Sequence, residues 1–157
     1  MSWGGGQERG LRSGTVNTPL VVAFGEAMAI AARDWKADQA RVTAFRDRLR
    51  DRLVADVAGV AVNGHATGRL ASNLSLSIDG VEPLALMRLL RETVAFSASS
   101  ACSTESFVTS HVLLAMWGDS PRSRQAFRLS PGRLTTQADI DLAATALIDG
   151  IGTLRSL

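Results

Sequence analysis

The chain has 157 residues, of which 46% are hydrophobic and 20% charged, and its mean hydropathy is +0.11. This length and composition predict a folded domain with its own core and exclude an intrinsically disordered chain. The formal net charge is only +2, and basic residues alternate with acidic ones, as in "RDRLRDRLVAD", so no nucleic-acid partner is expected.

Membrane and metal partners are not expected either. No apolar run approaches the roughly 18 residues that suggest a membrane span, and the start "MSWGGGQERG" lacks the basic-then-apolar order of a signal peptide. We therefore expect a cytoplasmic protein. One cysteine, Cys102, and two histidines, His65 and His111, do not form a spaced set of metal ligands, so no metal site is expected.

The chain begins with a glycine-rich arm over residues 1–18 that lacks periodicity. In "GGGQERGLRSGTVNTP", two arginines and the hydroxyl of Thr15 come just before a helix start at Pro19, with Thr18 as the expected N-cap. Backbone amides and hydroxyls at such a position bind phosphate well. Glycine content alone also fits a mobile N-terminal tail.

A long helix and then a series of short elements follow the arm. Apolar residues keep helical spacing over residues 19–57, which predicts one helix of a length that often connects two domains. The segment "NLSLSI" alternates large apolar residues with serine, which is typical of a strand with one buried face. The expected elements after residue 57 are strands at 59–64, 73–78, 93–98 and 125–130 and helices at 82–92, 106–118 and 135–154. The last helix starts with a capping-box pattern at Thr136 and Asp139.

These elements predict an α+β fold with a small, mostly antiparallel sheet covered by helices. The expected division is an arm over 1–18 that belongs to another domain, a connecting helix over 19–57, and a small domain over 58–157.

Two residues of the small domain stand out chemically. Cys102 lies in "SASSACSTES", where hydroxyl side chains favour a loop and offer little apolar surface for burial. A thiol there suits nucleophilic attack or sulfur transfer, although a lone cysteine is often a buried small hydrophobe. In "AFRLS", Phe127 and Leu129 point to one face of the strand and Arg128 to the other, where its guanidinium is available for a carboxylate or for solvent.

Taken together, these motifs resemble those of a known enzyme family. The segments "GGGQERGLRSGT", "VNG", "SNLSLSI", "SSAC", "FRLSPGR" and "TTQADID" occur in the order and at about the spacing of the C-terminal part of cysteine desulfurases of the NifS and IscS type. These are pyridoxal-phosphate (PLP) enzymes with the class V aminotransferase fold. The resemblance covers nearly the whole chain and implies a C-terminal small domain of a PLP enzyme of fold type I.

The resemblance also implies roles for individual residues. Cys102 matches the catalytic cysteine that takes sulfur from the substrate L-cysteine, becomes a persulfide and leaves L-alanine. Arg128 matches the arginine that binds the substrate carboxylate. Thr15 matches the threonine that reaches the PLP phosphate of the neighbouring subunit in a homodimer. A sulfur-acceptor protein is the implied partner, in iron-sulfur cluster assembly or a thiolation pathway.

The chain departs from the family pattern in two respects. Within the Cys102 loop, Ser99 replaces a usual glycine and Glu105 adds a negative charge that disfavours the thiolate, while Pro131 replaces an apolar residue further on. The lysine that anchors PLP has no counterpart, because the sole lysine, Lys36, lies in the charged stretch "RDWKADQ".

Three interpretations therefore remain. The chain is a C-terminal fragment of a desulfurase or one half of a split enzyme that assembles with a separate PLP-binding chain; it is a non-enzymatic persulfide carrier that uses Cys102 alone; or it is an inactive remnant.

Overall fold

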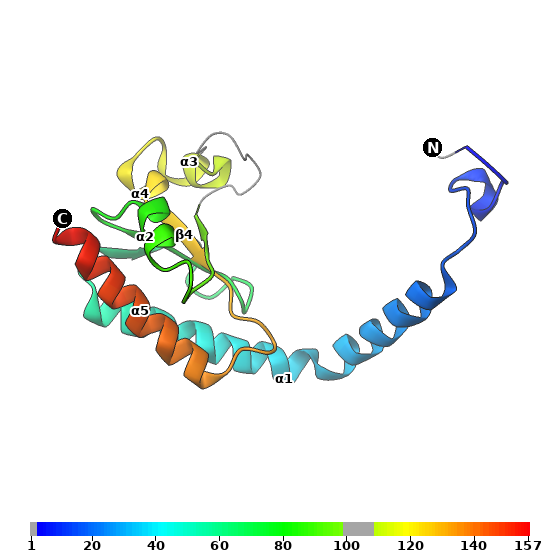
Figure 1. The fold of residues 1–157 in the computed structure, drawn as a ribbon, viewed down its shortest axis with the longest axis horizontal. Helices are drawn as coiled ribbons and strands as arrows, with labels where there is room; N and C mark the ends of the chain where they lie inside the picture. Colours follow the sequence, from blue (N-terminus) through cyan, green and yellow to red (C-terminus); the bar gives the residue numbers. More distant parts are fainter. Residues whose placement is uncertain (1–2, 99–108) are drawn as a thin grey trace. The chain divides into compact units, whose positions relative to one another are not determined.

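The computed structural model describes residues 3–98 and 109–157 (Figure 1). The chain divides into two compact units, Met1–Ala37 and Asp38–Leu157. In chain order the elements are the 3-10 helix η1 (Glu8–Gly10), α1 (Thr18–Asp56), β1 (Val60–Val62), β2 (Leu74–Ile78), α2 (Pro83–Leu89), β3 (Ser97–Ala98), α3 (His111–Trp117), α4 (Pro121–Arg124), β4 (Ala126–Leu129) and α5 (Gln137–Arg155).

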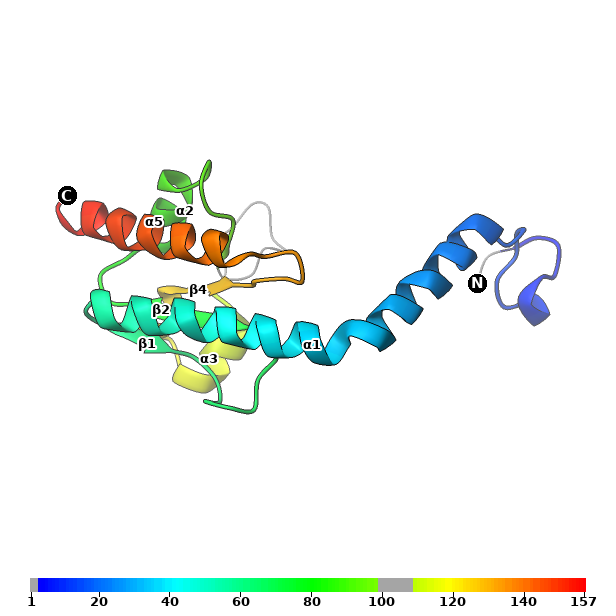
Figure 2. The ribbon, with the colours of Figure 1, turned by 90° about the horizontal axis from the view of Figure 1, so that it is seen from below.

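The second unit is built on a four-stranded sheet with strand order β1-β2-β4-β3, in which every neighbouring pair is antiparallel. Residues 38–56 of α1 lie beside α5 on one face of this sheet, where Arg48 Nε and Asp141 Oδ1 pair at 2.9 Å (Figure 2). Helices α3 and α4 lie toward the other face (Figure 1). This arrangement confirms the predicted α+β fold with a small antiparallel sheet.

The core follows from the alternation read in the sequence. Large apolar side chains of β2 and β4 point to the same face and pack against α1, α2 and α5, since residues two apart on a strand share a face. The fully buried residues of the core include Leu49, Leu53, Leu74, Leu76, Ile78, Val81, Leu86, Phe127, Ala144, Leu147 and Ile151. Burial of this apolar surface is the main stabilising contribution to the second unit.

The prediction of one buried face for β2 was incomplete. Ser77 points away from the apolar core yet is only 2% exposed. Helix α4 lies against β2 there, and the Ser77 hydroxyl donates to the Arg122 carbonyl at 2.7 Å. The sheet is therefore covered on both faces at this position, by apolar side chains on one and by a hydrogen-bonded helix on the other.

Several element boundaries differ from the sequence-based expectation. The N-cap of α1 is Asn17 rather than Thr18, because Asn17 Oδ1 accepts from the Leu20 amide at 3.2 Å and Thr18 is already helical. Strand β3 comprises Ser97–Ala98 instead of residues 93–98, since a turn occupies residues 90–93 and residues 94–96 are not in a strand. The short helix α4, with its Ser120 capping box, was not predicted.

The capping box predicted for the last helix is confirmed. Thr136 Oγ1 accepts from the Asp139 amide at 3.2 Å, and Asp139 Oδ2 accepts from the Thr136 amide at 2.8 Å. The hydrogen bonds from the backbone and side chain of Thr136 lower the pKa of Asp139 below its ordinary value. The capping box thus provides acceptors for backbone N–H groups that have no partner within the first turn of α5.

Loss of this cap has a measurable effect on stability. We expect Thr136→Ala to lower the free energy of unfolding of the chain by about 1 kcal/mol, because it removes the side-chain acceptor at the helix start. Urea unfolding followed by circular dichroism measures the change. Thr145→Ala, an exposed site within α5, is the matched control and should change stability by less than about 0.5 kcal/mol. Equal losses in the two variants would contradict the prediction.

None of the helices in the described part of the chain combines the length and apolar character that a membrane crossing requires.

Candidate functional site

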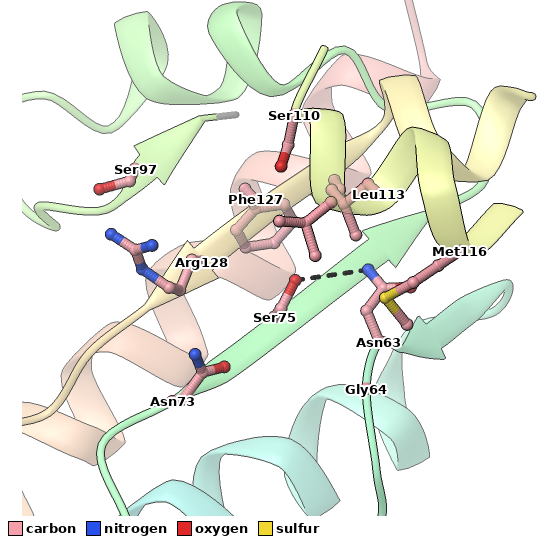
Figure 3. A pocket seen from close by; sticks show the side chains of 12 residues that line it. Asn63, Gly64, Asn73, Ser75, Ser97, Ser110, Leu113, Met116, Phe127 and Arg128 are labelled. Carbon is pink, nitrogen blue, oxygen red and sulfur yellow. Dashed lines mark hydrogen bonds between the residues drawn. The ribbon is translucent and has the colours of Figure 1, made fainter. Parts of the chain in front are cut away.

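A cavity of about 320 Å³ opens on the face of the sheet opposite the apolar core (Figure 3). Its lining comes from the sheet, from the start of α3 and from the loop after β1. The lining residues are Asn63, Gly64, Asn73, Ser75, Ser97, Ser110, Val112, Leu113, Met116, Ala126, Phe127 and Arg128. Polar side chains gather on the strand side and apolar ones on α3, so the cavity suits a ligand that has both a polar and an apolar part.

Among the described residues of this lining, Arg128 is the only one with an ionisable side chain. On β4 its neighbours Phe127 and Leu129 are buried, whereas Arg128 is exposed on the opposite face, as the alternation predicts. Ser75 on β2 and Ser97 on β3 are its direct cross-strand partners. Within residues 3–98 and 109–157, no side chain or carbonyl pairs with the Arg128 guanidinium, which leaves its donors available for a ligand.

The ends of the segment that carries Cys102 reach this cavity. Ser97 and Ser110 both line it, the first on β3 beside Arg128 and the second as the N-cap residue of α3. Cys102, Ser99 and Glu105 lie outside the described residues. The chain therefore enters and leaves the Cys102 segment at the cavity that contains the Arg128 guanidinium.

A buried polar network supports the β1 side of the cavity. Asn63 is 3% exposed, and its Nδ2 donates to Ser77 Oγ at 2.8 Å while its Oδ1 accepts from Arg122 Nε at 3.1 Å. Arg122 also donates to the Val62 carbonyl at 2.9 Å, and its guanidinium carbon lies 3.8 Å from the centroid of the Trp117 ring. These contacts tie α3 and α4 to the sheet and fix the position of the cavity wall.

The loop after β1 is held by its own hydrogen bonds. Arg69 donates to the Asn63 carbonyl at 3.0 Å and to the His65 carbonyl at 2.7 Å. Partial burial, and then the positive charges of Arg46 and Arg50, lower the pKa of Arg69 from its ordinary value. The guanidinium therefore acts here as a structural brace for the loop that ends at the cavity.

Two cavity residues, Asn63 and Asn73, were not recognised as site residues from the sequence. From the sequence, Asn63 was only part of the segment "VNG", and its burial depends on α4, which was itself not predicted. Asn73 precedes β2, and the period-2 alternation of "NLSLSI" was the signal that could have placed it on the same face as Ser75 and Arg128.

Thr15 lies in the first unit, in a loop with internal hydrogen bonds. Gln7 Oε1 accepts from the Gly14 amide at 3.0 Å, and Arg12 Nη1 donates to the carbonyls of Gly14 and Thr15 at 3.0 and 3.4 Å. Gly14 has a φ of +102°, which side chains other than glycine rarely adopt. Thr15 is exposed, so its hydroxyl is accessible to a phosphate oxygen.

The donor set of this chain fits PLP only in part. Thr15 offers a hydroxyl suited to the phosphate, but no lysine lines the Arg128 cavity. Lys36 lies exposed on α1, with its Nζ 5.8 Å from the centroid of the neighbouring Trp35 ring. Lys36 is therefore not among the residues that line this cavity. Among the described residues, no group of three or more His, Cys, Asp or Glu side chains is arranged to hold a metal ion.

Pro131, the departure from the family pattern that follows β4, lies at a structural position. Pro131 is buried after β4, and Arg133 pairs with Asp38 at 3.5 Å. His111 is exposed as the first residue of α3.

Comparison with known proteins gives a consistent result. The family model for aminotransferase class-V matches residues 4–142. Over 154 residues, which are 98% of this chain, the sequence is 42% identical to the cysteine desulfurase IscS of Tolumonas auensis and 40% identical to that of Pseudomonas putida strain GB-1. The chain spans 38% of the length of each of these relatives.

Solved structures show the same partial coverage. A NifS-like protein matches 96% of this chain with a TM-score of 0.81 at 28% sequence identity, and this chain covers 38% of it. DndA from Streptomyces lividans matches 83% of this chain with a TM-score of 0.59 at 30% identity, and 36% of that protein is covered. A NifS-like protein from Rickettsia africae, with a TM-score of 0.79 at 22% identity, shares the fold.

Proposed function

The chain belongs to the class-V aminotransferase family, and from this premise we propose that it forms the C-terminal part of a PLP-dependent cysteine desulfurase. It does so either as a piece of a longer polypeptide or as one half of a split enzyme. In both cases a lysine-bearing domain supplies the remainder of the active site, and the arm over residues 1–18 associates with that domain.

One observation carries this proposal. The guanidinium of Arg128, which has no partner among residues 3–98 and 109–157, faces a cavity at which the chain enters and leaves the segment bearing Cys102, the only cysteine. A carboxylate-binding cation and a nucleophilic thiol are the two groups that cysteine desulfuration requires from this part of the enzyme.

The residues of this chain have distinct roles in the proposed reaction. Arg128 holds the carboxylate of L-cysteine in the cavity. The Cys102 thiolate attacks the substrate sulfur, the substrate Cβ–S bond breaks, and Cβ takes a proton to give L-alanine while the sulfur remains on Cys102 as a persulfide. PLP, when bound, withdraws electrons from the substrate and makes this cleavage possible. Thr15 is the residue of this chain that would contact its phosphate, across a homodimer or a hetero-assembly.

The experiment is an assay of alanine release from L-cysteine with added PLP and a reductant. The chain alone is expected to release none, because its one lysine lies outside the Arg128 cavity. Adding a polypeptide that carries the PLP lysine of the family should give L-alanine in excess over enzyme. Alanine released catalytically by the isolated chain would contradict the requirement for a lysine-bearing domain.

A comparison of two variants separates the enzyme from a persulfide carrier. Cys102→Ser should abolish sulfur delivery by a desulfurase and Arg128→Ala should lower its rate on the order of 100-fold, whereas a carrier that receives its sulfur from another enzyme needs only Cys102. The proposal therefore expects persulfide formation to be lost in the first variant and strongly reduced in the second. Full sulfur delivery by Arg128→Ala would favour the carrier.

A further inference from the structure

We propose that Asn73 is a second contact for the substrate carboxylate, with its side-chain amide donating to the group that Arg128 holds. This assignment rests on the proposed function and identifies Asn73 as a residue that determines affinity for an α-carboxylate.

The strand register places Asn73 diagonally opposite Arg128. In the β2–β4 pair, Leu74 lies opposite Leu129 and Ser75 opposite Arg128. Asn73 comes one residue before Leu74, so its side chain shares a face with Ser75 and Arg128. Diagonal neighbours across an antiparallel pair lie within reach of long side chains. Figure 3 shows Asn73 and Arg128 on the same side of the sheet, and both line the cavity.

The side-chain amide of Asn73 makes no hydrogen bond to the described part of the chain. No residue among 3–98 and 109–157 hydrogen-bonds to its side chain, although its backbone amide donates to the Leu70 carbonyl at 3.1 Å. Asn63, on the same cavity, is buried and bonded to both Ser77 and Arg122. Of these two asparagines, Asn73 is thus the one whose polar group remains available to a ligand.

The chemistry of a carboxylate matches this pair of donors. A carboxylate offers about four lone-pair positions, and a guanidinium bound in bidentate fashion uses two of them. The Asn73 amide can donate to one of those that remain. Arg128 supplies the charge and Asn73 an uncharged donor from the neighbouring strand, so the combination is specific for a planar anion held at the sheet.

The first test measures steady-state kinetics in the enzyme completed by its lysine-bearing domain. Asn73→Ala should raise KM for L-cysteine about tenfold and leave kcat within about twofold, since the contact exists in ground state and transition state alike. Asn73→Asp should raise KM further by repelling the carboxylate. Gln137→Ala, which removes an exposed amide on α5, is the matched control. An unchanged KM in Asn73→Ala would overturn the proposal.

The second test needs no catalysis and uses the chain as it is. The side-chain amide signals of Asn73 and the Nε signal of Arg128 are followed by ¹⁵N NMR during titration with L-alanine and with L-alanine methyl ester. Shifts of both signals with L-alanine, absent with the ester, support the proposal. A shift of Arg128 without Asn73 overturns it and leaves the proposed function intact. No shift at either residue contradicts both assignments.

Discussion

Arg128→Ala is expected to lower kcat/KM for L-cysteine on the order of 100-fold in the completed enzyme, because removing one partner of a hydrogen-bonded charge pair costs about 3 kcal/mol. The guanidinium has no partner among residues 3–98 and 109–157, so the substitution removes a ligand contact without breaking an interaction of the fold. The stability of the chain should therefore change by less than about 0.5 kcal/mol.

Two further variants test whether the effect depends on the planar guanidinium at position 128 and not on positive charge in general. Arg128→Lys keeps the positive charge but loses the planar fork, and it should retain only about a tenth of the wild-type kcat/KM. Arg124→Ala removes an exposed arginine four residues earlier that pairs with Asp119 at 3.2 Å, and it should leave the kinetics unchanged. A wild-type KM in Arg128→Ala, or equal losses in Arg124→Ala and Arg128→Ala, would refute the assignment of Arg128 to the substrate carboxylate.

Local sequence patterns were sufficient to predict elements whose buried and exposed faces alternate in a regular way along the chain. The alternation in "NLSLSI" and "AFRLS" predicted β2 and β4 and placed Arg128 on the face away from Phe127 and Leu129. The start of α5 followed from the capping pair Thr136 and Asp139, because the box depends on residues three apart.

Other features depend on contacts that a local pattern does not contain. Helix α4 has only four residues, too few for apolar periodicity to be visible. Its position against β2 makes Ser77 buried, although serine at an alternating position normally faces solvent. The burial of Asn63 has the same origin, since its side chain bonds to Ser77 and Arg122. No local pattern therefore predicted the burial of this asparagine.

The position of the candidate site was predictable in part. The alternation of β4 predicted the exposed face on which Arg128 lies, and the family resemblance implied a carboxylate as its ligand. The convergence of Asn73, Ser97 and Arg128 on one cavity required the strand order β1-β2-β4-β3, in which β4 lies between strands that are distant in sequence. The pairing of β4 with β2 and with β3 joins segments that are far apart in the sequence. No local sequence pattern determines such a pairing, so the sequence alone did not place these side chains together.

The buried Asn63 network gives the second large expected effect, on stability. Asn63→Ala should lower the free energy of unfolding by about 2–3 kcal/mol, because it leaves Arg122 Nε without its Asn63 acceptor and removes the Nδ2 donor to Ser77. The loss also weakens the connection of α3 and α4 to the sheet, through the stack of Arg122 on Trp117. Urea unfolding of the chain followed by circular dichroism measures the change.

Asn73→Ala is the matched control for this measurement, because it deletes the same side chain at a position ten residues later where the amide has no bonded partner in the described chain. It should cost less than about 0.5 kcal/mol. A double-mutant cycle of Asn63→Ala with Ser77→Ala should give a coupling energy of about 1 kcal/mol, since the two side chains share one hydrogen bond of 2.8 Å. Equal costs for the two asparagine variants would mean that the network does not stabilise the fold. The contrast between them separates a side chain that holds the cavity wall from one that remains available to a ligand.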